Sequence, residues 1–152
     1  MKLSVDFTLQ ELTNSEIAQR NNIANIPNAD QITNLVLLCQ YILQPVRVHF
    51  NKPVIITSGY RSPELCTLIG SKPTSQHTQG QAADFKITGI ANKTVSDWIV
   101  NNLNYDQCIL EFYNEKEPNS GWVHCSYSFD NNRKEYLQAT KSNGTVLYTK
   151  IS

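Results

Sequence analysis

Two histidines and an aspartate form the pattern in this sequence that most directly suggests chemistry. His77 and Asp84 stand seven positions apart, and His124 follows forty positions after Asp84. Imidazole nitrogens and carboxylate oxygens are ligands that Zn²⁺ accepts, and three protein ligands leave a fourth coordination position for water. Because an open position is typical of catalytic zinc sites, these three residues predict a catalytic metal centre.

Two predicted strands and a loop would position these residues. The alternation of side chains in residues 82–87 predicts a strand with Asp84 on one face and apolar side chains on the other. Residues 122–127 predict a second strand, on which His124 faces away from its apolar neighbours. His77 lies in the polar loop that enters the first strand. The alternative is that His77 caps this loop and Asp84 is a solvated strand residue.

Helices are expected to form most of the core in the amino-terminal half. Apolar residues recur at helical spacing from Asp30 to about Phe50. Pro45 lies inside this stretch, and a kink is expected there because proline removes a backbone hydrogen bond and crowds the preceding turn. Further helices are expected to follow Ser62 and Thr94, which have the side chains of N-cap residues.

Strand-like patterns elsewhere complete the predicted fold. Residues 54–58 and 107–113 each predict a strand, and residues 134–151 predict a terminal hairpin. The fold class expected is α+β, with a small antiparallel sheet that carries the zinc site and packs against N-terminal helices. No repeat or linker interrupts the sequence, so residues 1–152 are expected to form a single domain.

Several blocks of the sequence resemble one known family. The motif residues that carry the likeness are Ser75, His77, Gly80, Ala82, Asp84, Trp122 and His124. In this order and spacing they are similar to the signature of the zinc D-Ala-D-Ala carboxypeptidase family. Segments 7–12, 43–47 and 55–65 are also similar to that family. The likeness reaches to about Ser128, and it is strongest to the small branch found in phages and bacteria.

The resemblance implies a zinc metallopeptidase that hydrolyses an amide bond in peptidoglycan stem peptides. Zn²⁺ would be the cofactor, with His77, Asp84 and His124 as its ligands. Both a D-Ala-D-Ala carboxypeptidase and a related endopeptidase, phage or prophage encoded, fit this expectation. The alternative is a zinc-binding module without turnover that binds the wall or builds a phage particle. The related hedgehog signalling domain is an example of a zinc-bearing module that has kept the fold and lost turnover.

The resemblance also suggests which residues contact the substrate. Arg61 lies where a predicted strand turns into a helix, and a guanidinium there could clamp a substrate carboxylate through two parallel hydrogen bonds. Ser75 is expected to help hold a substrate carboxylate or carbonyl. Trp122 is expected to pack against the site and to orient His124.

Glu111 is the predicted general base. It is the only acid in an apolar strand, and alternation turns it away from the neighbouring apolar side chains. Many relatives place this acid in an E-x-x-H arrangement before the last histidine, but here Gly121 occupies that position. Glu115 and Glu117 in the following loop are weaker alternatives.

Composition excludes some classes of partner. The 13 basic and 13 acidic residues balance, and they form no basic cluster, so no nucleic-acid partner is expected. No apolar run has the length of a membrane span, so no membrane partner is expected either. The expected partner is a peptidoglycan peptide, bound by a monomer.

An acid, Asp6, stands where the apolar core of a signal peptide would begin. Synthesis in the cytoplasm is therefore expected, with action on the wall after release or delivery, or within a virion.

Four cysteines without C-x-x-C spacing lie among apolar neighbours. The pattern favours reduced, buried thiols that behave as small hydrophobic side chains. Cys125 adjoins His124, but on a strand it would point to the opposite face and so would not be a metal ligand.

Overall fold

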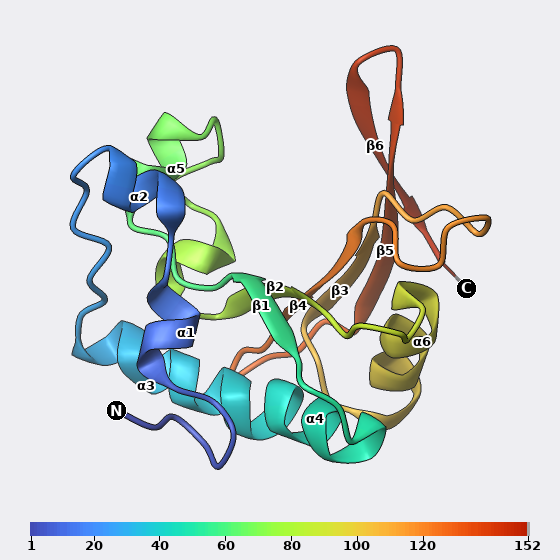
Figure 1. The fold of residues 1–152 in the computed structure, drawn as a ribbon, viewed down its shortest axis with the longest axis horizontal. Coiled ribbons are helices and arrows are strands. Elements are labelled where there is room, and N and C mark those ends of the chain that lie inside the picture. Colours follow the sequence, from blue (N-terminus) through green and yellow to red (C-terminus); the bar gives the residue numbers. More distant parts are fainter. Residues whose placement is uncertain (152) are drawn as a thin grey trace.

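The computed structural model describes residues 1–151 and contains one six-stranded sheet with helices packed against it (Figure 1). The strand order is β1-β2-β4-β3-β5-β6. Neighbouring strands are antiparallel except β3 and β5, which are parallel. The strand bounds are β1 Ile55–Ser58, β2 Ala82–Lys86, β3 Gln107–Glu111, β4 Trp122–Ser126, β5 Glu135–Ser142 and β6 Thr145–Lys150. The predicted α+β class is thus confirmed.

Helical segments precede and interrupt the strands along the chain. Their bounds are α1 Leu9–Thr13, α2 Glu16–Arg20, α3 Ala29–Leu38, η1 Cys39–Leu43, α4 Gln44–Phe50, α5 Pro63–Leu68, η2 Gln76–Gln79 and α6 Asn92–Asn102. None of the helices within residues 1–151 is long and apolar enough to cross a membrane.

The amino-terminal helix accommodates Pro45 through a change of helix type. α3, η1 and α4 follow one another without a break, and η1 is a π-helical turn in which Gln44 N donates to Cys39 O. Pro45 is the second residue of α4, which follows this turn. The wider turn gives room for a proline ring, which would otherwise crowd the turn before it. The disturbance expected at Pro45 therefore takes the form of a π-helical turn.

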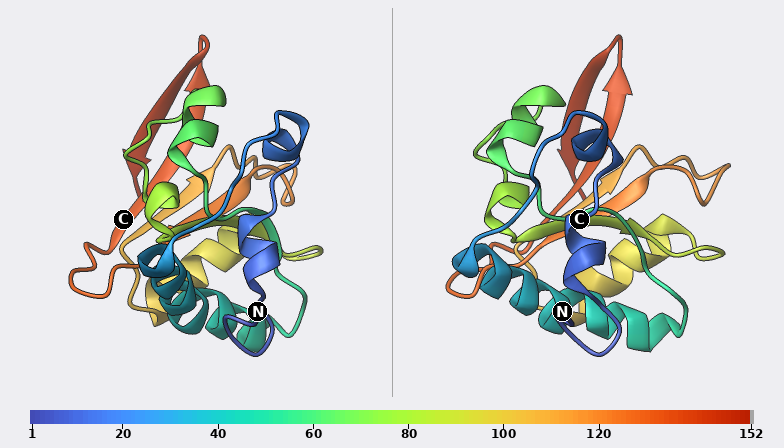
Figure 2. Two further views of the ribbon diagram at one scale, coloured as in Figure 1. Left: turned by 90° about the vertical axis from the view of Figure 1, so that its left-hand side faces the viewer. Right: turned by 60° about the vertical axis from the view of Figure 1, so that its left-hand side comes forward.

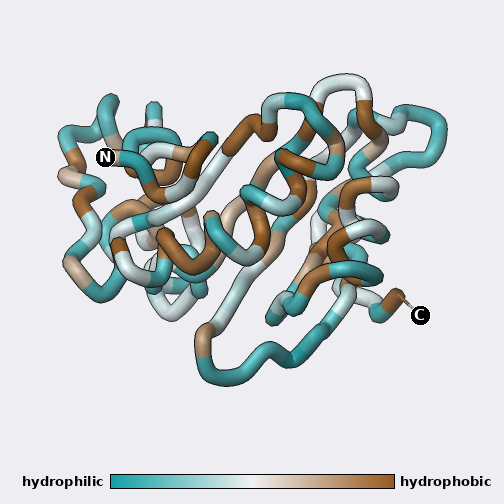
Figure 3. Tube along the Cα trace, turned by 90° about the horizontal axis from the view of Figure 1, so that it is seen from below, coloured by the Kyte–Doolittle hydropathy of each residue, from teal (hydrophilic) through white to brown (hydrophobic). Residues whose placement is uncertain are grey.

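The hydrophobic core lies between the helices and one face of the sheet. Phe85 of β2 and Val123 of β4 are fully buried there, together with Leu38 of α3. Figure 3, seen from the helical side, shows apolar residues recurring between polar ones along these helices. Because side chains alternate along a strand, Asp84 and His124 are turned to the opposite face of the sheet.

One predicted helix start is wrong. α6 begins at Asn92 with Ala91 as its N-cap, and Thr94 lies inside the helix. Asn92 is buried, its backbone N donates to Pro118 O at 3.1 Å, and its side chain donates to Ser120 O at 2.8 Å. Contacts with a distant loop, rather than a local cap, therefore set where this helix begins.

All four cysteines are buried free thiols: Cys39, Cys66, Cys108 and Cys125. Burial raises the pKa of Cys39 to about 12. Cys125 is fully buried on the core face, and burial raises the pKa of its thiol as well. A thiol that stays protonated is a poor ligand and a poor nucleophile. This agrees with the prediction that the cysteines act as small apolar side chains.

Candidate metal centre

His77 is placed by the short helix η2, which leads into β2. The helix is capped by Ser75, whose Oγ accepts a hydrogen bond from His77 N at 3.2 Å. It ends at Gly80 with φ of +73°, where a Cβ would lie 2.4 Å from Gln31 O, so only glycine fits. His77 Nδ1 donates to Gly59 O at 2.7 Å, because a carbonyl oxygen can only accept. This hydrogen bond fixes the tautomer and leaves the lone pair on Nε2 free.

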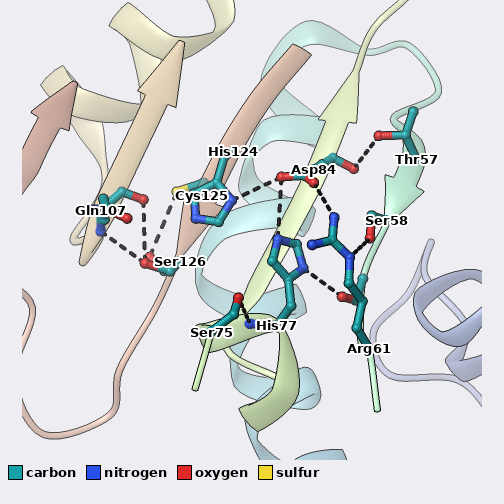
Figure 4. Close-up of polar contacts among 11 residues, drawn as sticks. Thr57, Ser58, Arg61, Ser75, His77, Asp84, Gln107, His124, Cys125 and Ser126 are labelled. Carbon is teal, nitrogen blue, oxygen red and sulfur yellow. Dashed lines mark hydrogen bonds and ion pairs between the residues drawn. The ribbon is translucent and has the colours of Figure 1, made fainter. Parts of the chain in front are cut away.

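Asp84 and His124 are placed by the pairing of β2 with β4. The two residues are direct cross-strand partners, and His124 Nδ1 lies 2.9 Å from Asp84 Oδ1. His77 Nε2 lies 3.5 Å from the same oxygen. The three candidate ligand atoms all lie within 4.8 Å of one another, and all three residues are buried. Figure 4 shows both imidazole rings turned toward the Asp84 carboxylate. The structure thus brings the predicted set together.

The protonation states of this cluster suit metal binding. Burial lowers the pKa of His77, and the nearby carboxylate of Asp84 offsets this only in part. Burial alone would raise the pKa of Asp84, but His77 and the hydrogen bond from His124 outweigh it and hold the pKa well below its usual range. A neutral imidazole and an ionised carboxylate are the forms in which these side chains bind metal ions. The donor set therefore fits Zn²⁺.

Arg61 lies beside the metal cluster, at the turn between β1 and α5. Its Nε donates to Ser58 Oγ at 2.7 Å, and its Nη2 donates to Asp84 Oδ2 at 3.1 Å. Ser62 caps α5, and its Oγ accepts from Leu65 N at 3.2 Å, which confirms the predicted helix start. The guanidinium carries five N–H donors, so several remain available to a ligand. Its role as a substrate clamp stays a prediction.

Glu111 ends β3 on the same face of the sheet. Burial raises the pKa of Glu111 to about 7, and the negative charge of Asp84 acts in the same direction. Gly121, with φ of +67°, approaches Glu111 so closely that a Cβ would lie 1.8 Å from the Glu111 carbonyl oxygen. Position 121 can therefore hold only glycine. A glutamate three residues before His124, as in an E-x-x-H arrangement, would clash with the Glu111 backbone. Glu115 and Glu117 are exposed and do not line the site.

Trp122 is the cross-strand partner of Glu111. Its ring packs at a tilt against Phe112, with centroids 5.4 Å apart. Its indole Nε1 is buried and has no hydrogen-bond partner among residues 1–151. An unsatisfied buried donor is costly, and the Trp122 side chain lies close enough to Glu111 to lower the pKa of that carboxyl, so the Glu111 carboxylate is the acceptor within reach of this N–H. Trp122 lines the groove, and its contact with the substrate and its orientation of His124 stay predictions.

The candidate site residues line one open groove of about 990 Å³. The predicted site residues that line it are Arg61, Ser75, His77, Asp84, Glu111, Trp122 and His124. Sequence reasoning missed other lining residues, namely Gln76, Gln107, Ile109, Arg133, Leu137 and Tyr148. Most of these lie outside any motif. Alternation along the strands was the only signal that could have found Ile109 and Leu137.

Fold and site together define a hydrolytic enzyme of the metallopeptidase class. A His–Asp–His cluster with converging ligand atoms lies beside a glutamate whose pKa is about 7, in an open groove. The sequence model of the Peptidase M15 family matches residues 5–126, and the chain belongs to this family. A comparison with curated proteins finds no match. Residues 127–151, which include the β5–β6 hairpin, lie beyond the matched region.

Proposed function

We propose that the protein is a zinc-dependent peptidase that hydrolyses an amide bond in peptidoglycan stem peptides, as a D-Ala-D-Ala carboxypeptidase or a related endopeptidase. The observation that carries this proposal is the convergence of one ligand atom each from His77, Asp84 and His124 within 4.8 Å. Membership of the Peptidase M15 family supports hydrolysis of a peptide bond. The substrate would be reached after release or delivery, or within a virion.

The three converging residues would hold Zn²⁺, with one coordination position left open. When bound, the ion would polarise the scissile carbonyl and lower the pKa of a water molecule. His77 is held in the required tautomer by its hydrogen bond to Gly59 O, and Asp84 is held as a carboxylate. The protein thus supplies its ligands already oriented, which lowers the entropy lost on binding.

Glu111 would act as the general base and later as the general acid. A carboxyl group with a pKa of about 7 is half ionised at neutral pH, so it can both accept and return a proton. The carboxylate would take a proton from the attacking water and deliver it to the leaving amine nitrogen. Its position at the end of β3, across from Trp122, in the groove that the metal cluster also lines, supports this role.

Arg61 and Ser75 would hold the substrate. Arg61 is anchored by Ser58 and Asp84, so its guanidinium loses little freedom when it binds a carboxylate. Ser75 lines the groove next to η2, and its hydroxyl can donate to a carboxylate or carbonyl oxygen. A carboxylate held at this end would place the neighbouring amide bond over the metal cluster.

The test is digestion of purified muropeptides with known sequences, with and without a chelator, followed by mass spectrometry. Loss of a terminal D-Ala would identify a carboxypeptidase, and cleavage between earlier residues would identify an endopeptidase. In either case the chelator should abolish product formation, and added Zn²⁺ should restore it. Binding without cleavage would favour the non-enzymatic module, and cleavage that survives the chelator would contradict the zinc mechanism.

A further inference from the structure

The β5–β6 hairpin contributes a wall of the groove although it lies beyond the region matched by the family. It rises from the sheet on the same side as α5 (Figures 1 and 2). Leu137 of β5 and Tyr148 of β6 line the groove together with the metal cluster. This part of the chain therefore adds its own side chains to the site.

The register of the sheet places Tyr148 in one row with Glu111. Glu111 pairs with Trp122 on one side and with Ala139 on the other, and Ala139 pairs with Tyr148. Directly paired residues share a face of the sheet, so all four side chains lie on the groove side. Two strand spacings of about 4.8 Å each separate the backbones of Glu111 and Tyr148. Side chains as long as these can bridge much of that span.

Ala139 lies between Glu111 and Tyr148 in this row. Its methyl group is short, and the residue is only 1% exposed even though it lies on the groove side. Tyr148 itself is 57% exposed, so its ring is accessible to a bound molecule. Among residues 1–151, burial and the charges of Glu111 and Asp84 shift the pKa of the Tyr148 hydroxyl, with no hydrogen bond among the causes.

The surroundings keep the Tyr148 hydroxyl in its donor form. Burial raises the pKa of Tyr148, and the negative charges of Glu111 and Asp84 act in the same direction. A protonated phenol can donate one hydrogen bond to a carbonyl oxygen. Arg61 and Tyr148 stand at opposite ends of the strand order, with the metal cluster and Glu111 between them.

We propose that Tyr148 is a substrate-binding residue whose hydroxyl donates a hydrogen bond to a backbone carbonyl of the bound peptide. This carbonyl lies on the amino-terminal side of the scissile bond, across the metal cluster from the carboxylate held by Arg61. The ring of Tyr148 also covers that part of the peptide. The inference rests on the proposed function, because it takes the stem peptide as the occupant of the groove.

The experiment compares Tyr148→Phe and Tyr148→Ala with the parent protein. Steady-state kinetics give kcat and KM, and calorimetry with a muropeptide gives Kd on the Glu111→Gln background, where turnover does not interfere. Tyr148→Phe should raise Kd and KM about threefold to tenfold, the effect of one neutral hydrogen bond, while kcat stays within about twofold. Tyr148→Ala should raise both further because the ring contact is also lost.

Two controls separate this effect from general damage to the hairpin. Leu147→Ala changes the exposed neighbour on the other face of β6, and Tyr41→Phe removes the hydroxyl of a half-exposed tyrosine in η1. Both should retain the parent values. Parent-like Kd in Tyr148→Phe and Tyr148→Ala, or a fall in kcat with unchanged Kd, would overturn the assignment of Tyr148. If the parent neither binds nor cleaves muropeptides, the proposed function itself fails.

Discussion

Asp84 and His124 face each other directly across β2 and β4, and a 2.9 Å contact joins Asp84 Oδ1 to His124 Nδ1. Their separation is therefore fixed by strand register rather than by loops. A slip of one residue would turn either side chain into the core, because successive residues of a strand point to opposite faces. Only His77 depends on local turn structure, through η2 and Gly80.

Glu111→Gln should separate metal binding from catalysis. The substitution keeps the shape of the side chain and removes the proton acceptor. We expect turnover to fall by about a hundredfold or more while zinc content and thermal unfolding stay close to those of the parent. Kinetics on a muropeptide, with metal analysis of the same samples, would measure this.

The matched controls are Glu115→Gln and Glu117→Gln, which change exposed acids in the loop after β3. Both should retain parent turnover. An active Glu111→Gln enzyme alongside an inactive loop variant would mean that the base is in the loop.

Arg61→Lys tests whether a guanidinium is required rather than a positive charge. Lysine keeps the charge but cannot form two parallel hydrogen bonds with a carboxylate. We expect kcat/KM to fall at least about tenfold for Arg61→Lys, with a larger loss for Arg61→Ala, and zinc content to be retained. The idea fails if both variants have parent kinetics.

The face of the sheet on which the candidate site lies was predictable from local sequence patterns. Alternation alone places Asp84 and His124 on one face of their strands, and the structure agrees. The capping residue Ser62 likewise marks the start of α5. The sequence shows glycine instead of an acid at position 121, three residues before His124. The close approach of Gly121 to the Glu111 carbonyl gives the physical reason.

Features that depend on distant contacts were not predictable in this way. The start of α6 is set by hydrogen bonds from Asn92 to Pro118 and Ser120 in a distant loop. The local capping pattern at Thr94 therefore predicted the wrong start. The parallel pairing of β3 with β5 places Tyr148 in the groove, and no local pattern specifies which strands become neighbours.

Asp106 provides a test of stability that changes none of the candidate metal ligands. It is 3% exposed, accepts three hydrogen bonds from Arg133, and accepts another from Gln76 Nε2 at 2.8 Å. Burial alone would raise the pKa of Asp106, but these hydrogen bonds outweigh it and lower the pKa. Asp106→Asn should reduce the free energy of unfolding by about 2 kcal/mol.

The pH dependence follows from the sign of this shift. Because the pKa of Asp106 is lower in the folded state, its contribution is fully present above the unfolded value near 3.8. It is lost as the pH falls through the folded value. The stability difference between parent and Asp106→Asn in urea should therefore be constant near neutral pH and shrink below about pH 4. Asp130→Asn, at an exposed position, should show neither effect. An Asp106→Asn protein as stable as the parent at neutral pH would contradict this prediction.

The most direct test of the central claim is the zinc content of purified single variants. The sequence has three histidines, and His49 stacks on Trp98 with centroids 4.3 Å apart, outside the groove. The parent and His49→Ala should each carry about one zinc per chain, whereas His77→Ala and His124→Ala should carry far less because two remaining ligands bind weakly. Unchanged zinc in both His77→Ala and His124→Ala would contradict the account.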